Sequence, residues 1–262
     1  MALADRNFYY PTAKQYDHPA NYNLAFEDVY FPGADGVTLH GWFFPATDPV
    51  GTVLHAHGNA GNITGHFPFV AWLPAVRWNV LCFDYRGYGN STGRITREGM
   101  VNDIHAAAEY LHERPDVKSS KVCLFGQSIG GSTGLVAAAK WDLHLAGIVI
   151  DGAFSSYRIE ARFVTRRVWY LRGASWLISR YLISDDLSPI DYVPGLPRIP
   201  KLFICGDADR IVDYRQTVAL HDAATDPKQL WIIPGADHTE AASGELPTGR
   251  ERIAAFLRLC IA

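Results

Sequence analysis

Short apolar runs and helix-length segments alternate along most of this chain, and this alternation limits its possible folds more than any other feature. Six runs have the β-branched and aromatic composition of buried strands, at 51–58, 79–85, 121–128, 145–152, 200–206 and 228–235. Helix-length segments lie at 66–76, 96–114, 129–141, 213–224 and 249–260. Continuously apolar strands that alternate with helices indicate a mostly parallel sheet covered by helices on both faces. The sequence therefore predicts an α/β fold.

Two further strand candidates precede this alternation. FEDVYFP (26–32) and VTLHGWFFPA (37–46) are separated by Gly33-Ala34-Asp35-Gly36, which is typical of an antiparallel hairpin at a sheet edge. They bring the predicted central sheet to about eight strands. Because the chain has no internal repeat and no linker-like stretch, residues 1–262 are predicted to form a single domain.

Residues 155–193 interrupt the alternation. Only a short connection is expected at this point of the chain, but the segment is 155–193 and contains no strand-like run. Within this segment a helical apolar face is indicated by residues at three- and four-residue steps, namely Ile159, Phe163, Val164, Val168 and Leu171. Ligands of open α/β sheets bind at the carboxyl ends of the strands. We therefore expect 155–193 to be a helical cap, or lid, above those ends.

Composition narrows the class of ligand. Charged residues make up 19% of the chain and its net charge is −3, so neither disorder nor a nucleic-acid partner is expected. A small, neutral or weakly charged substrate fits this balance better. The aromatic residues Phe8, Tyr9 and Tyr10 predict an N-terminal strap that packs its rings onto the body.

Cysteine usage and hydropathy favour an intracellular protein. The four cysteines (Cys82, Cys123, Cys205 and Cys260) match the spacing of neither a zinc site nor a disulfide framework, so no metal is expected. The N-terminus lacks the apolar core of a signal peptide, and no apolar run reaches the roughly 20 residues of a membrane helix. We expect a cytoplasmic protein, either a monomer or a small homo-oligomer.

The stretch GQSIGG (126–131) places Ser128 between a predicted strand and a predicted helix. Such a strand-to-helix join exposes the serine hydroxyl, and the small residues around it let backbone segments approach closely. The helix N-terminus then directs backbone N–H groups toward a developing negative charge. Ser128 is the predicted nucleophile.

A serine hydroxyl needs a neighbouring base, and the base needs a carboxylate that orients it. His238 follows the last predicted strand and is the expected base. Asp209, three residues beyond Gly206 where the strand leaves the sheet, is the expected acid. Asp207 is its closest alternative, with turn capping as the other explanation for it, and Asp151 is more distant. Asp237 adjoins His238 but is expected to point elsewhere.

An oxyanion hole requires two N–H donors. Ile129, next to the nucleophile, supplies one candidate. The glycine-rich loop HGNAGNITGH (57–66) follows the first of the six strands, and the N–H of Asn59 is the second candidate, with Ala60 as the alternative. His57 is expected to organise this loop by hydrogen bonding. The loop lacks the phosphate-binding patterns G-x-x-x-x-G-K-[ST] and G-x-G-x-x-G.

Five motifs together resemble one family. HGNAGN, FDYRGYGNSTG, GQSIGG, GDADRIV and GADH occur in the order and spacing of the α/β-hydrolase superfamily, and more narrowly of small single-domain serine hydrolases with an H-G-N-A-G-N oxyanion loop. The resemblance covers nearly the whole chain. It implies Ser128 as nucleophile, His238 as base and Asp209 as acid, with ester or thioester hydrolysis and no cofactor. It also assigns Arg86 and Tyr88 to a structural loop beside the site.

The expected activity is a serine esterase that forms an acyl-enzyme on Ser128 and takes a small ester or acyl substrate. Amidase or peptidase chemistry uses the same residues, and a non-catalytic ligand-binding protein is the alternative from another class. In the cap, an apolar substrate-binding roof is predicted from Phe163, Trp169 and Trp176, together with Tyr170 and Leu177. The cap also holds six arginines, namely Arg158, Arg162, Arg166, Arg167, Arg172 and Arg180. The first three recur every four residues, which favours one solvated strip, or a weak contact of that strip with an acidic membrane surface.

Overall fold

The computed structural model describes residues 8–246 and 248–262. Within them an eight-stranded sheet has the order β10-β9-β8-β7-β4-β6-β3-β2. β3 pairs antiparallel with both β2 and β6, and the other neighbours pair in parallel. This arrangement confirms the predicted sheet and its antiparallel edge hairpin. The strands are β2 (Glu27–Pro32), β3 (Thr38–Phe44), β4 (Gly51–Ala56), β6 (Trp78–Phe83), β7 (Val122–Gln127), β8 (Gly147–Asp151), β9 (Lys201–Gly206) and β10 (Lys228–Ile233).

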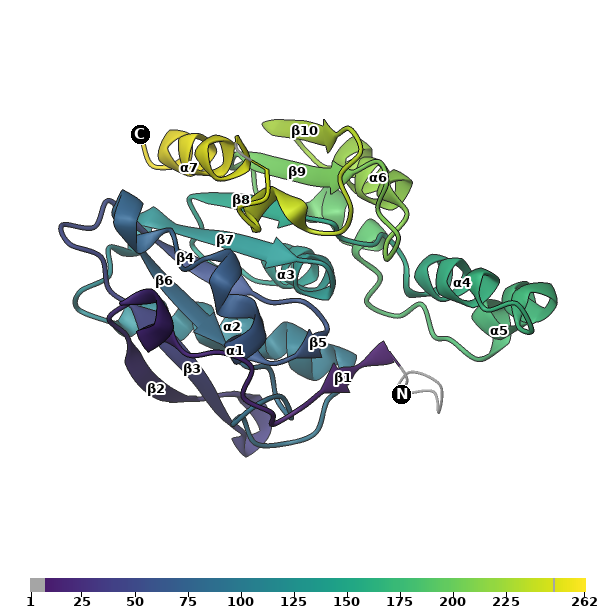
Figure 1. Ribbon diagram of the computed structural model, residues 1–262, viewed down its shortest axis with the longest axis horizontal. Coiled ribbons are helices and arrows are strands. Elements are labelled where there is room, and N and C mark those ends of the chain that lie inside the picture. The colour runs from purple at the N-terminus through teal and green to yellow at the C-terminus, as the bar shows by residue number, and fades with distance from the viewer. Residues whose placement is uncertain (1–7, 247) are drawn as a thin grey trace.

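Helices cover both faces of the sheet (Figure 1). One face packs against α2, α3 and α6, whose apolar residues share a core with alternate strand positions such as Leu54. The other face packs against α1 and α7, in a second core that includes Val53. The helices are α1 (Ile63–His66), α2 (Arg97–Glu113), α3 (Ile129–Lys140), α4 (Tyr157–Arg167), α5 (Ser175–Tyr181), α6 (Tyr214–Ala223) and α7 (Gly249–Cys260).

Local capping residues begin the long helices where the sequence predicts them. Thr96 Oγ1 accepts the Gly99 N–H at the start of α2, and Asp213 caps α6 in the same way. α2 ends at the residue before Arg114, which is followed by Pro115, and a residue that precedes proline is disfavoured in a helix. These boundaries leave the loops at the carboxyl ends of β4, β7, β8 and β9 free to carry functional side chains.

The prediction of a helix over 66–76 was wrong. The chain forms only the single-turn helix α1, followed by 3-10 turns at Phe67–Phe69 and Pro74–Val76. Pro68 and Pro74 have no N–H to donate, and each interrupts a continuous α-helix. Three apolar residues of this stretch, Phe67, Val70 and Leu73, are nevertheless fully buried.

The N-terminal strap pairs with the loop that carries Asn59. β1 (Tyr10–Pro11) pairs in parallel with β5 (Ala60–Gly61). The Phe8 ring packs edge-on against Tyr157, with centroids 5.8 Å apart, and Tyr9 is buried. Tyr10 is 63% exposed because strand geometry turns it to the opposite side, so only two of the three rings pack as predicted.

The segment 155–193 carries α4 and α5, which project together from one side of the molecule (Figure 1). Ser156 caps the start of α4 by accepting the Ile159 N–H on its Oγ, and the helix ends at Arg167. Val168 and Leu171 therefore lie beyond the helix, and the predicted apolar face is shorter than expected. No described helix is long and apolar enough to cross a membrane.

Candidate active site

Ser128 forms the sharp join between β7 and α3. Its backbone angles, φ 53° and ψ −122°, are strained for a residue with a side chain. The Ser128 N–H donates to the carbonyl of Asp151 at 2.9 Å, which fixes the turn from the neighbouring strand. A Cβ atom on Gly130 would overlap the carbonyl oxygens of Ala56 and His57, so only glycine fits there. The small residues thus allow α3 to start directly against the end of β4.

His238 and Asp209 form a direct pair on the loops that follow β10 and β9. His238 Nδ1 lies 2.7 Å from Asp209 Oδ2, and the Asp209 side chain is only 1% exposed. Asp209 Oδ1 accepts two further hydrogen bonds, from the N–H groups of Ile211 and Val212. Burial alone would lower the pKa of His238, but the hydrogen bond and charge of Asp209 outweigh it and raise that pKa. A paired, oriented imidazole is suited to accept a proton.

The backbone of Asp151 and Gly152 brings this pair to the serine. The Asp151 carbonyl accepts the Ser128 N–H, and Gly152 follows with φ 67°. A Cβ atom on Gly152 would lie 3.0 Å from His238 Cε1, so the imidazole rests against this glycine. Ser128 and His238 therefore border the same peptide, although they stand 110 residues apart in the sequence.

The neighbouring acids have other partners, as predicted. Asp207 Oδ1 accepts the Gly235 N–H at 2.6 Å and so closes the turn after β10. Asp237 pairs with the Arg210 guanidinium and accepts the His238 N–H at 2.9 Å. These contacts fix the loops on both sides of His238, and they leave Asp209 as the carboxylate that reaches its ring.

The side chain of Asn59 anchors the loop after β4 to the N-terminal strap and to Tyr88. Asn59 Oδ1 accepts from the Tyr10 N–H and from the Tyr88 hydroxyl, and its Nδ2 donates to the Phe8 carbonyl. These three contacts occupy the Asn59 side chain, and the assignment of its backbone N–H to an oxyanion hole stays a prediction. Ile129 is the first residue of α3, and N–H groups in the first turn have no partner within a helix.

Two histidines support this loop, and only one was predicted to do so. His57 is fully buried and its Nδ1 lies 2.7 Å from the Gly58 carbonyl oxygen, which confirms its organising role. His66, given no role from the sequence, stacks on His57 and its Nε2 lies 2.6 Å from the Ala60 carbonyl oxygen. A Cβ atom on Gly58 would lie 3.1 Å from His66 Cε1 and 3.8 Å from Ser128 Cβ. The position of His66 at the end of α1, closing the loop HGNAGNITGH, was the available signal.

Two buried carboxyl groups surround the His238–Asp209 pair. Burial raises the pKa of Asp151 to about 7, and the nearby Asp209 charge adds to this shift. Burial likewise raises the pKa of Glu160 to about 7, although a hydrogen bond from Gln216, at 2.7 Å, opposes it. Glu160 was missed because its burial depends on packing between α4 and α6, and nothing in its local sequence marks it.

The predicted substrate-binding residues lie on the projection formed by α4 and α5. Phe163 is partly buried, and the Arg167 guanidinium stacks over its ring at 4.8 Å. Trp169 is 85% exposed and Trp176 is 50% exposed. Arg158 does not belong to a solvated strip, because its Nε donates to the Ile183 carbonyl at 3.0 Å.

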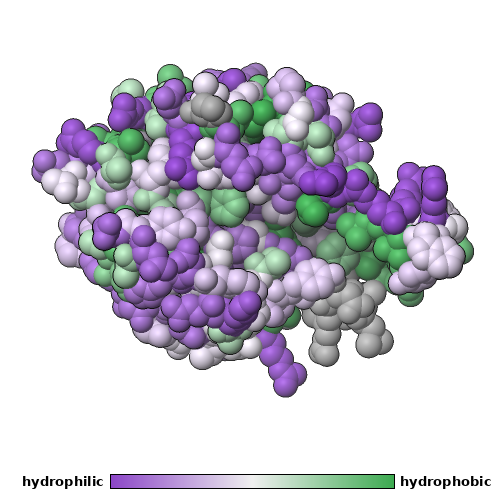
Figure 2. Space-filling view, viewed as in Figure 1, coloured by the Kyte–Doolittle hydropathy of each residue, from purple (hydrophilic) through white to green (hydrophobic). Residues whose placement is uncertain are grey.

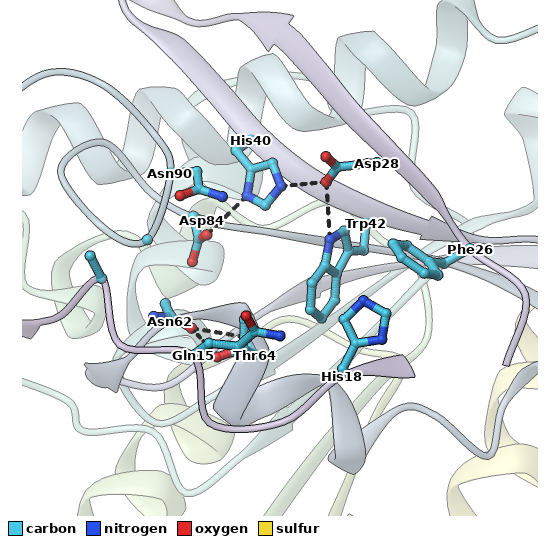
Figure 3. Close-up of a pocket in the computed structure, with 12 residues that line it drawn as sticks. Gln15, His18, Phe26, Asp28, His40, Trp42, Asn62, Thr64, Asp84 and Asn90 are labelled. Atoms are coloured by element: carbon cyan, nitrogen blue, oxygen red, sulfur yellow. Dashed lines mark hydrogen bonds and ion pairs between the residues drawn. The ribbon is translucent and has the colours of Figure 1, made fainter. Parts of the chain in front are cut away.

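A separate hollow of about 330 Å³ lies beside the loop HGNAGNITGH. It is lined by Asp28, His40, Trp42 and Asp84 among others (Figure 3). His40 lies between two carboxylates, with Nε2 2.6 Å from Asp28 and Nδ1 3.2 Å from Asp84. Burial opposes protonation of His40, but these carboxylates raise its pKa. Asp84 Oδ1 also accepts the Ile63 N–H. The cluster joins β2, β3 and the end of β6 to α1, and thereby supports the loop HGNAGNITGH.

Comparison with known proteins places the chain in a family. Residues 47–192 match the sequence family described as serine aminopeptidase, S33. The chain belongs to this family, within the α/β-hydrolase superfamily. This hydrolase is 36% identical to the uncharacterized protein YfhR of Escherichia coli over 242 residues, which cover 90% of this chain and 80% of YfhR.

Two solved structures share the fold of this hydrolase. The esterase Pf2001 of Pyrococcus furiosus has a TM-score of 0.78 and 19% identity, over 97% of this chain and 100% of that one. A puromycin-hydrolyzing peptidase of Mycobacterium tuberculosis has a TM-score of 0.75 and 19% identity, over 92% of this chain and 40% of that one. At these identities the likeness concerns the fold alone.

Proposed function

We propose that this hydrolase is a serine esterase that cleaves carboxylic esters or thioesters through an acyl-enzyme on Ser128. The observation that carries the proposal is the His238–Asp209 hydrogen bond beside the strained Ser128 turn. A carboxylate can only accept, so the proton lies on His238 Nδ1 and the lone pair lies on Nε2. Nε2 is then the atom that takes the proton of Ser128 Oγ as the oxygen attacks the acyl carbonyl.

The remaining steps use groups already described. The N–H groups of Ile129 and Asn59, with Ala60 as the alternative to Asn59, stabilise the oxyanion of the tetrahedral intermediate. His238 then protonates the leaving alcohol or thiol, and a water activated by the same nitrogen releases the acid. Phe163, Trp169 and Trp176 are proposed to contact the acyl chain. No cofactor enters this sequence of steps.

An aminopeptidase or amidase on the same three residues is the second candidate, because the fold is shared by a protein named an esterase and one named a peptidase. An aminopeptidase must bind the positively charged amine of its substrate. Residues 161–184 hold five arginines and no acidic residue, and the buried Glu160 beside them is already bonded to Gln216. This charge distribution favours a neutral or acidic substrate over an ammonium group.

The test is a rate series with p-nitrophenyl esters from acetyl to palmitoyl, run beside aminoacyl p-nitroanilides and the Ser128→Ala variant. We expect ester turnover that falls by at least about 10³-fold in Ser128→Ala. Turnover of anilides alone would replace the esterase by the peptidase. Absence of turnover on both series, together with no labelling of Ser128 by a fluorophosphonate, would favour the non-catalytic ligand-binding protein.

A further inference from the structure

The projection formed by α4 and α5 exposes an unusual amount of apolar surface. Eight large apolar side chains between 159 and 182 are at least 47% exposed, with Trp169 at 85%, Tyr181 at 71% and Tyr170 at 68%. The others are Ile159, Val164, Trp176, Leu177 and Leu182. Apolar side chains gathered in this way mark a surface that binds a partner. We call residues 159–182 the cap surface.

The cap surface is also strongly basic. Residues 161–184 contain Arg162, Arg166, Arg167, Arg172 and Arg180 but no Asp, Glu or Lys, in a chain whose net charge is −3. Figure 2 shows strongly hydrophilic residues over α4, with hydrophobic and paler residues directly beneath them, toward α5. An apolar surface bordered by positive charges favours a partner that is both apolar and negatively charged.

Three of these arginines converge on one hollow. Arg162, Arg166 and Arg172 line a space of about 440 Å³ with Ser175 and Trp176. Arg162 Nε is buried and has no hydrogen-bond partner among the described residues. No ion pair joins any of the three to a carboxylate in the part of the chain that the structure describes. Guanidinium groups without partners are suited to bind phosphate oxygens in pairs.

We propose that the cap surface docks onto a membrane surface rich in anionic lipid, with the arginines on lipid phosphates and the aromatic rings at the headgroup level. Arginine, tryptophan and tyrosine together are the residues that favour this interface. A second copy of the chain is a poorer occupant, because a two-fold contact would place both sets of arginines against each other. A neutral apolar ligand would leave the arginines unpaired.

A contact chain connects the cap surface to the candidate active site. The Arg167 guanidinium donates to the Arg210 carbonyl, and the Arg210 side chain pairs with Asp237. Arg210 directly follows Asp209, and Asp237 directly precedes His238. A membrane bound at the cap surface would therefore lie next to the loops that hold the proposed acid and base.

The first test is cosedimentation with vesicles of phosphatidylcholine alone and of phosphatidylcholine mixed equally with phosphatidylglycerol. The variant R166E/R172E/R180E reverses three exposed charges on the cap surface, and R94E/R198E/R258E reverses three exposed charges elsewhere. We expect binding to the anionic vesicles alone, reduced on the order of 100-fold in the cap variant and much less in the control. Equal binding to both kinds of vesicle, or equal losses in the two variants, would overturn the proposal.

A second measurement follows the aromatic residues. Tryptophan emission should shift to shorter wavelength on anionic vesicles, and the shift should be lost in W169A/W176A. If light scattering instead shows a dimer that hides these tryptophans without lipid, a second copy occupies the surface and the docking proposal fails. The Ser128→Ala variant should bind vesicles as the wild type does, so the result is independent of the proposed esterase activity.

Discussion

Asp209 holds His238 with one carboxylate oxygen and its own loop with the other. Oδ2 lies 2.7 Å from His238 Nδ1, while Oδ1 accepts the Ile211 and Val212 N–H groups at 2.7 and 2.9 Å. The two backbone bonds prevent the carboxylate from rotating, so the imidazole has one orientation and one tautomer. The loop after β9 thus determines where the His238 lone pair points.

Asp209→Asn should therefore lower kcat more than any change to a neighbouring acid. The amide keeps the shape of the side chain but no longer stabilises the imidazolium, and we expect a loss on the order of 10³–10⁴-fold in ester hydrolysis. Asp207→Asn is the matched control, because Asp207 only closes the turn at Gly235. Similar losses in both variants would exclude the assignment of Asp209 as the acid.

The pH profile gives a second readout of the same pair. The base must be neutral, and Asp209 raises the pKa of His238, so wild-type activity should fall as the pH drops through a value above that of a free histidine. In Asp209→Asn this acid limb should move to lower pH. An acid limb at the same pH in both proteins would contradict the coupling.

Sequence alone was sufficient for the parts of the fold that depend on local pattern. The strands are short, continuously apolar and separated by turn residues, so their existence and order could be predicted before the structure. Ser128 and His238 could also be singled out as candidate site residues, because each follows a recognisable strand and lies in a distinctive local motif. Even the choice of Asp209 over Asp207 followed from where the strand leaves the sheet at Gly206.

Features that depend on contacts across the chain could not be predicted in this way. The helix-length segment 66–76 suggested a helix, but Pro68 and Pro74 break it into turns that still bury Phe67, Val70 and Leu73. Glu160 is buried against Gln216, which lies 56 residues away. His66 supports the oxyanion loop only because α1 turns it back toward Ala60. Tertiary packing decides each of these.

Tyr88→Phe tests whether the oxyanion loop needs its side-chain anchor. The variant removes only the hydroxyl that donates to Asn59 Oδ1 at 3.0 Å, within a fully buried ring. We expect kcat for ester hydrolysis to fall about 5-fold, with KM nearly unchanged, since a neutral hydrogen bond contributes about 1 kcal/mol. Tyr110→Phe is the control, because Tyr110 lies on α2 and its hydroxyl accepts from Arg114, just beyond the end of that helix and away from the site. An unchanged kcat in Tyr88→Phe would mean that the strap alone holds Asn59.

Asp151→Asn should change how stability depends on pH. Burial raises the pKa of Asp151 from 3.8 to about 7, so the folded state binds more protons than the unfolded state between these values. Stability contributed by the protonated group is complete below pH 3.8 and is lost as the pH rises through 7. Relative to wild type, the variant should therefore gain about 2–3 kcal/mol between pH 5 and pH 8, measured by urea unfolding at each pH. A difference between the two proteins that is constant with pH would contradict this.

Gly130→Ala should destabilise the protein through the Ser128 turn itself. The new Cβ would overlap the carbonyl oxygens of Ala56 and His57, which belong to the backbone and cannot rotate away. We expect the free energy of unfolding to fall by about 3 kcal/mol, with ester hydrolysis lost even where the fold persists, because β4 and α3 must separate. Gly134→Ala should cost less, since its Cβ would meet only the end of the Leu124 side chain, at 2.9 Å. Gly173→Ala, with open space around it, should change stability by less than about 0.5 kcal/mol. If all three variants unfold at the same urea concentration, close packing at Gly130 is not what fixes the position of Ser128.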